Sequence, residues 1–166
     1  MSDGREPSLE ILRRLNDSGY LFYRDPARVR ADDLLVRARA ADCLHRAAAV
    51  LSLAEQKLRR AIPAPSRETP FPDPVLLTAA RDLKALQERI ATLETRLRGP
   101  AALPDRDFSA IIPTEEVRLR LVTLDAVLLD RAAAIEAAAP ALTTVLDGFE
   151  QALADRAQLT ELHQRP

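Results

Sequence analysis

Apolar residues repeat every three or four positions between Asp73 and Gly99, and this repeat constrains the fold more than any other feature. Every a and d position of three heptads is filled, by Leu76, Ala79, Leu83, Leu86, Ile90, Leu93 and Leu97. Asp73-Pro74 precedes the repeat and Gly99-Pro100 follows it, which are the signals of a helix start and a helix stop. We therefore expect a helix over 74–98 whose apolar side packs against another helix.

A second long helix is expected before it. Asp25-Pro26 gives the same start signal, and no glycine or proline follows as far as Ile62. Large and small residues then alternate at heptad spacing, as Leu44, Leu51 and Leu58 with Ala47, Ala54 and Ala61 three positions after each. This alternation lets a neighbouring helix approach closely, so it favours antiparallel packing of a helix over 26–62.

The last third of the chain carries one heptad register on both sides of a proline. Its members run from Val117 to Leu159, and Pro140 lies within this range without being one of them. An internal proline removes a hydrogen bond and clashes with the carbonyl four residues back, which bends a helix. Because the register survives the proline, we predict one long helix over 114–164 with a kink at Pro140.

Proline-rich linkers, 63–73 and 99–113, separate these helices, and a short helix is expected within the first 24 residues. The predicted fold class is all-α: an elongated antiparallel three-helix bundle with coiled-coil character, a short N-terminal helix and a long, proline-kinked last helix. We divide the chain into an N-terminal tail, 1–24, and a single helical-bundle domain, 25–166.

Composition supports a helical protein. Alanine and leucine make up 56 of the 166 residues, whereas there are only 4 glycines, 6 aromatic residues and 1 cysteine. Such a chain lacks the residues for a β-sandwich, a disulfide scaffold or a glycine-rich phosphate loop. It has a polar N-terminus and no apolar stretch long enough to span a membrane. We expect a cytoplasmic protein in a reducing compartment.

Charge is distributed unevenly along the chain. Residues 1–62 hold 12 basic and 9 acidic groups, and residues 114–166 hold 5 basic and 9 acidic groups. These segments would attract each other within a bundle or between subunits. The net charge of −1 and the interleaved acids argue against a nucleic-acid partner.

The sequence contains no recognisable catalytic or metal-binding motif. His45 and His163 lie in different predicted helices, and Cys43 is expected to be a small buried hydrophobe. Asp32-Asp33 is interpreted as a first-turn charge cluster and Asp105 with Asp107 as solvated turn residues. We therefore predict no catalytic residues, no cofactor, no metal and no small-molecule substrate.

One polar residue occupies a core-type position. Arg131 lies in the heptad register of the last predicted helix, where a buried guanidinium would need a carboxylate or carbonyl partner. Its stem could instead pack while its charged head reaches solvent. The more specific hypothesis makes Arg131 a register-setting residue that pairs with an acid on a partner helix.

Aromatic residues gather outside the heptads, and the 148–162 end of the long last helix is expected to project past its neighbours. Such side chains either plug the ends of the bundle or form contact points for a partner. The candidate partner-interface residues are Tyr20, Phe22, Tyr23, Phe108, Ile111, Ile112, Phe149, Leu153 and Leu159.

These features predict a non-enzymatic protein–protein interaction module that uses helical, coiled-coil surfaces. It would be an adaptor, an assembly factor, a chaperone-like protein or a structural subunit of a larger complex, bound to a protein partner or to copies of itself. The alternative is a helical-bundle enzyme or ligand-binding regulator with a site between helices. A third is a nucleic-acid-associated factor that uses the arginine-rich helix over 24–60.

Overall fold

A computed structural model describes residues 22–25, 27–64, 66–67, 70–99, 114–137 and 142–162, and these residues fold into four helices. The helices are α2 (Val29–Ala61), α3 (Pro74–Arg98), α5 (Glu115–Ala137) and α6 (Leu142–Leu162). No strand occurs in these residues, so the all-α prediction is confirmed. None of the helices described is both long and apolar enough to cross a membrane.

Helix α3 has the boundaries that the sequence predicts. The Asp73 carboxylate accepts the Val75 N–H at 2.8 Å, and the Gly99 N–H closes the last turn on the Thr95 carbonyl. Helix α2 begins at Val29, slightly later than predicted. Asp25 forms a preceding turn, in which its carboxylate accepts the Ala27 N–H and its carbonyl accepts the Arg28 N–H.

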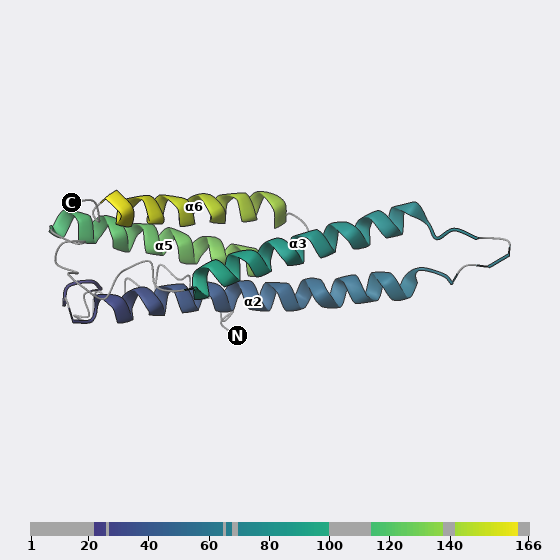
Figure 1. The fold of residues 1–166 in the computed structure, drawn as a ribbon, viewed down its shortest axis with the longest axis horizontal. Coiled ribbons are helices and arrows are strands. Elements are labelled where there is room, and N and C mark those ends of the chain that lie inside the picture. The colour runs from purple at the N-terminus through teal and green to yellow at the C-terminus, as the bar shows by residue number, and fades with distance from the viewer. Residues whose placement is uncertain are drawn as a thin grey trace, which may run out of the picture.

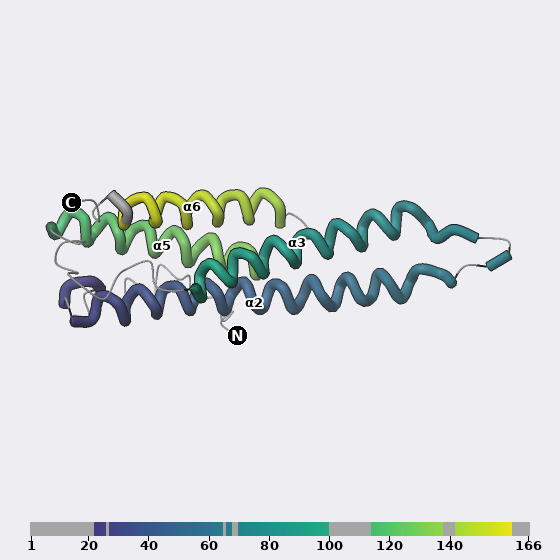
Figure 2. The backbone as a smooth tube through the Cα atoms, in the orientation of Figure 1, coloured from purple at the N-terminus to yellow at the C-terminus, as the bar shows by residue number. Residues whose placement is uncertain are grey.

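The prediction of one kinked helix over 114–164 is wrong, because this part of the chain forms two helices. Helix α6 runs back beside α5 (Figures 1 and 2). Two contacts show the antiparallel register: Arg156 on α6 pairs with Asp125 on α5, and Arg131 lies against Gly148. Helix α5 ends three residues before Pro140. A further helical turn would need a backbone N–H at residue 140, which proline lacks.

The four helices form two layers, so the three-helix bundle is also wrong. Helices α2 and α3 make one antiparallel pair and α5 and α6 the other, with α5 packed along α2 and α6 beside α3 (Figure 1). The core is made mostly of leucine and alanine side chains, together with valine, isoleucine, Cys43, Phe22, Tyr23 and Phe149. Ion pairs lie at the edges of this core. Arg46 pairs with Glu136, and Arg89 pairs with both Asp147 and Glu150.

Helices α2 and α3 continue well past the other pair as a two-helix hairpin (Figure 2). We call this hairpin, residues 48–61 and 74–88 with the linker between them, the arm. The sequence predicted that residues 148–162 would project instead. That prediction is wrong because α6 folds back onto α5 and buries its apolar side there. The predicted N-terminal helix and most of the linker 99–113 lie outside the described residues.

Candidate functional site: a buried charge network and an uncovered arm

A cluster of charged side chains is buried where the two layers meet, at the end of the bundle away from the arm. Helix α2 contributes Asp32, Asp33 and Arg37, α5 contributes Arg118 and Asp125, and α6 contributes Arg156. The cluster therefore contains three carboxylates and three guanidinium groups. Charges of this kind are stable in a protein interior only when each is paired, so the balance is a structural requirement.

Arg156 lies at the centre of this charge network. Its Nε donates to the Asp125 carboxylate and its Nη2 donates to Asp33 Oδ1. The same Nη2 also lies 3.4 Å from the Tyr23 hydroxyl. One side chain of α6 thereby binds α2, α5 and the segment before α2, which fixes how far α6 can slide along the other helices.

Tyr23 joins the network from the segment before α2. Its φ of 60° is in the left-handed region, which is unfavourable for a tyrosine. Two hydrogen bonds hold it there: its N–H donates to Asp32 Oδ2 at 2.9 Å, and its hydroxyl donates to Asp125 Oδ2. The segment before α2 is thus held against α5 by buried groups.

Arg37 and Arg118 tie backbone carbonyls to the network. Arg37 Nη2 donates to the carbonyls of Arg96 and Gly99, at 3.1 and 3.0 Å, where the end of α3 leaves carbonyls without helical partners. Its Nη1 lies 3.5 Å from Asp33 Oδ2. Arg118 Nη1 donates to the Phe22 carbonyl at 3.1 Å. All the described helices are therefore linked through this one cluster.

Burial changes the proton affinity of these groups. Desolvation raises the pKa of Asp125, and the charge of Arg156 opposes that rise. Desolvation, followed by the charge of Asp125, raises the pKa of Tyr23 well above its ordinary value. Burial lowers the pKa of Arg156, but the facing Asp125 carboxylate and its neighbours outweigh that effect and keep the guanidinium charged. The charged groups of the network are thus paired with one another and buried from solvent.

The predicted partner-interface residues fall into two groups. Phe22, Tyr23, Phe149 and Leu159 are buried in the chain's own core, and Leu153 packs partly buried against that core. These five do not form an exposed surface, because the return of α6 along α5 covers them. The other four, Tyr20, Phe108, Ile111 and Ile112, lie outside the described residues.

Arg131 is exposed, and its guanidinium lies over Gly148, where an added Cβ would be 3.6 Å from Nη1. Among the described residues it forms no ion pair with a carboxylate. Arg156, which occupies the same heptad register further along the chain, pairs with acids on two other helices. Cys43 is buried as predicted, and burial raises the pKa of its thiol.

The buried charge network was not predicted from the sequence, although a signal for part of it is present there. Arg37 lies seven residues before Leu44, and Asp33 lies seven before Ala40 and fourteen before Ala47. Both polar residues thus extend the apolar seam of α2 toward its start. Charged residues at seam positions of two helices, Asp33 and Arg37 in one and Arg156 in the other, indicate a buried ion pair between them.

The second feature is the arm, in which the apolar seam of α2 and α3 is no longer covered by α5 and α6. On α2, Val36 and Cys43 are buried, but Val50 is 52% exposed and Lys57 is exposed at the same heptad position. Ala40 and Ala47 are likewise buried, whereas the equivalent Ala54 and Ala61 are exposed. The face that α5 covers in the bundle is therefore open along the arm.

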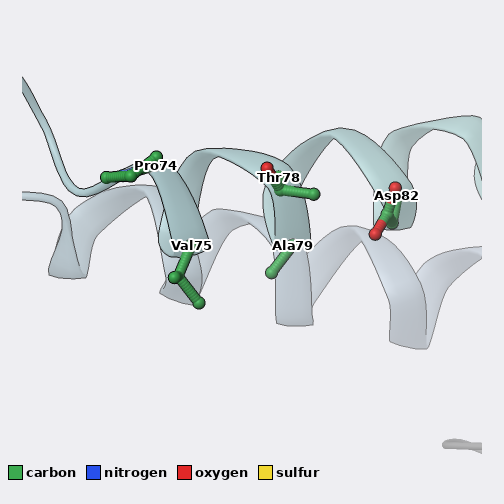
Figure 3. Close-up of a pocket in the computed structure, with 5 residues that line it drawn as sticks. All are labelled: Pro74, Val75, Thr78, Ala79 and Asp82. Carbon is green, nitrogen blue, oxygen red and sulfur yellow. The ribbon is translucent and has the colours of Figure 1, made fainter.

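Helix α3 shows the same change. Ile90, Leu93 and Leu97 are buried, whereas the preceding members of the repeat are only partly buried, namely Leu76, Ala79, Leu83 and Leu86. Near the tip a shallow hollow is lined by residues of the first turns of α3, and Val75 and Ala79 project from the same side of this helix (Figure 3). Val75 is 71% exposed. Among the described residues, the face beside α6 thus continues into the arm without a neighbour.

Comparisons with known proteins leave the interpretation to these two features. No family model, curated protein or solved structure matches the chain. The residues described hold no cluster of three or more His, Cys, Asp or Glu side chains suited to a metal ion. The charged groups of the network are paired with one another, whereas in the arm exposed apolar positions continue a seam that is buried in the bundle.

Charge also differs between the two ends of the arm. Its α2 tip carries Lys57, Arg59 and Arg60 with one acid, Glu55, an excess of two positive charges. At its base, where α5 ends and α6 begins, three carboxylates surround two guanidinium groups, an excess of one negative charge. These are Glu136, Asp147 and Glu150 with Arg46 and Arg89.

Proposed function

We propose that this chain is a non-enzymatic protein–protein interaction module that binds through the open face of its arm. In this role it serves as an adaptor, an assembly factor or a structural subunit of a larger complex. The proposal places it in the cytoplasm, where its single buried cysteine, Cys43, needs no disulfide partner.

The observation that supports the proposal is the loss of cover along one continuous seam. Val36, Cys43 and Val50 have the same helical position, yet only the first two are buried. A heptad seam on two adjacent helices is favourable only where other helices cover it. We propose that the partner supplies these helices and packs against the arm in the manner of a coiled coil.

The buried network gives this arrangement its rigidity. Arg156, Asp33 and Asp125 fix the register of α6 against α2 and α5, so the bundle forms a defined base for the arm. A rigid base limits the entropy lost when the arm binds a partner. The network therefore supports binding indirectly, by holding the arm in one direction.

Photo-cross-linking in cells of the native source tests this function. A photoreactive amino acid replaces Val50 on the open face or, as the control, Gln56 on the outward side of the same helix. We expect discrete protein adducts from position 50 and none from position 56. The proposal fails if position 50 gives no adduct, or if both positions give the same diffuse pattern expected of random collisions.

A further inference from the structure

We infer that the arm binds the arm of a second copy of this chain, so that two arms form a four-helix bundle. This inference rests on the proposed function and names its partner. Residues that α5 and α6 cover in one half of the α2–α3 pair are open in the other half, as the series Ala40, Ala47, Ala54 and Ala61 shows.

The open face defines what can cover it. Inside the chain, the occupant of the same surface is an antiparallel pair of helices with an apolar inner side. The arm is itself such a pair, and its own open side carries Val50, Ala54, Val75 and Ala79, with Lys57 following at the heptad position of Val50. Small residues allow helices to approach closely, and two identical arms match in length over their whole open faces.

Steric constraints fix how the two arms point. Helices α5 and α6 lie on the side of the α2–α3 layer that the arm leaves open (Figure 1). If the arms pointed the same way, the α2–α3 layer of one copy would overlap α5 and α6 of the other. The arms must therefore point in opposite directions about a two-fold axis, which gives a closed, isologous dimer.

Charge complementarity favours the same arrangement. With the arms opposed, the tip of α2 in one copy reaches the end of α5 in its partner. The tip has an excess of positive charge from Lys57 and Arg60, whereas the base of the partner's arm has an excess of one negative charge, because Glu136, Asp147 and Glu150 outnumber Arg46 and Arg89. Opposed arms thus bring unlike charges together twice, once at each end of the dimer.

The size of the face sets the expected affinity. Residues 48–61 span about 21 Å at 1.5 Å per residue, and two helices side by side are about 20 Å wide. Such a contact is at the small end of specific interfaces, so we expect dissociation in the micromolar range. Only measurements over a wide concentration range can detect such a dimer.

Sedimentation velocity and multi-angle light scattering on the full chain, from roughly 10 μM to 1 mM, test this inference. We expect the mass to rise from monomer to dimer and stop there. Val50→Glu with Ala54→Glu should raise the dissociation constant at least about tenfold. Ala49→Glu with Gln56→Glu adds the same charge to exposed positions on the outward side of the same helix, and should leave it unchanged.

A second pair of variants keeps the test independent of the apolar face. Lys57→Glu with Arg60→Glu should weaken the dimer several-fold and reduce its sensitivity to salt. Circular dichroism checks that each variant keeps its helices. A mass that stays monomeric throughout, or a dimer that the open-face and control variants affect equally, overturns the inference. If the chain is monomeric but position 50 cross-links to a different protein, the interaction function stands and the second copy is excluded.

Discussion

At the scale of single residues, Arg156 decides how the helices fit together. It is buried between Asp33 and Asp125, which lie on different helices. Such buried pairs add little net stability compared with apolar residues, but breaking one leaves an unpaired charge in the core. A helix that slid by one turn would separate Arg156 from both acids, so the network selects one register.

Removal of the Arg156 guanidinium should destabilise the bundle. Arg156→Met should lower the free energy of unfolding by about 3–5 kcal/mol, because it leaves Asp33 and Asp125 buried without their partner. Arg131→Met removes the same charge at an exposed position of α5 and should change the free energy by less than about 0.5 kcal/mol. Urea unfolding followed by circular dichroism compares the two. Equal effects would show that the network does not hold the bundle.

Tyr23 gives a prediction at alkaline pH. Its pKa is raised by burial in the folded chain, so the folded state keeps the phenol proton at a pH where the unfolded state loses it. By linkage, stability is unaffected below the unfolded pKa of about 10 and falls as the pH rises above it. In Tyr20→Phe, which leaves Tyr23 as the single tyrosine, tyrosinate absorbance should appear only together with loss of helix. Ionisation at the ordinary pKa with helicity intact would contradict the buried hydrogen bond.

At the scale of elements, the sequence was sufficient to predict a helix boundary wherever neighbouring residues cap that end of the helix. Asp73-Pro74 and Gly99 gave α3 its correct boundaries, because capping involves only neighbouring residues. The end of α5 before Pro140 was not predicted, because the heptad repeat gives the spacing of apolar residues and does not show whether the chain reverses its direction between them. Leu128 and Leu142 face one core from two antiparallel helices, and their spacing is that of a single helix.

The charge network shows why the candidate site was harder to predict than the fold. Tyr23 and Arg156 are separated by 133 residues in sequence, and their partners lie on two other helices. Sequence can indicate that Arg37 or Arg156 occupies a seam, but only the packing of α6 against α2 and α5 brings the opposite charges together. That packing depends on the reversal between α5 and α6.

This reversal can be measured directly. Val127 and Ala154 are exposed and, by the register of Asp125 with Arg156, lie across from each other on α5 and α6. Spin labels at these positions, in a Cys43→Ala background, should be within about 20 Å, because packed helices are about 10 Å apart. A single continuous helix would separate the two positions by about 40 Å. A label distance near the larger value would contradict the hairpin.

At the scale of the whole molecule, two regions differ in how many contacts hold them. In the bundle, each helix contacts neighbours in its own layer and the other layer, and the network ties the layers together. In the arm, the described parts of α2 and α3 face only each other on the seam side. Stability should therefore fall along the same two helices from the bundle to the tip.

Hydrogen exchange at low micromolar concentration tests this difference. Amides of residues 52–61 and 75–85 should exchange at least about tenfold faster than those of residues 36–47 and 90–97, because opening the arm exposes less apolar surface. The comparison is internal to α2 and α3, so helix propensity and solvent are closely matched. Uniform protection along both helices in the monomer would show that the arm is as stable as the bundle.

The arm's isolation from α5 and α6 also bears on how such a chain can change over evolution. Seven residues added to each arm helix would lengthen the hairpin by about 10.5 Å and return every seam residue to its original side. The contacts of Arg156, Asp33 and Asp125 would be untouched, since they lie in the bundle. Relatives of this chain can therefore differ in reach while keeping the same base, and the arm's length becomes a quantity that selection can adjust in steps of one heptad.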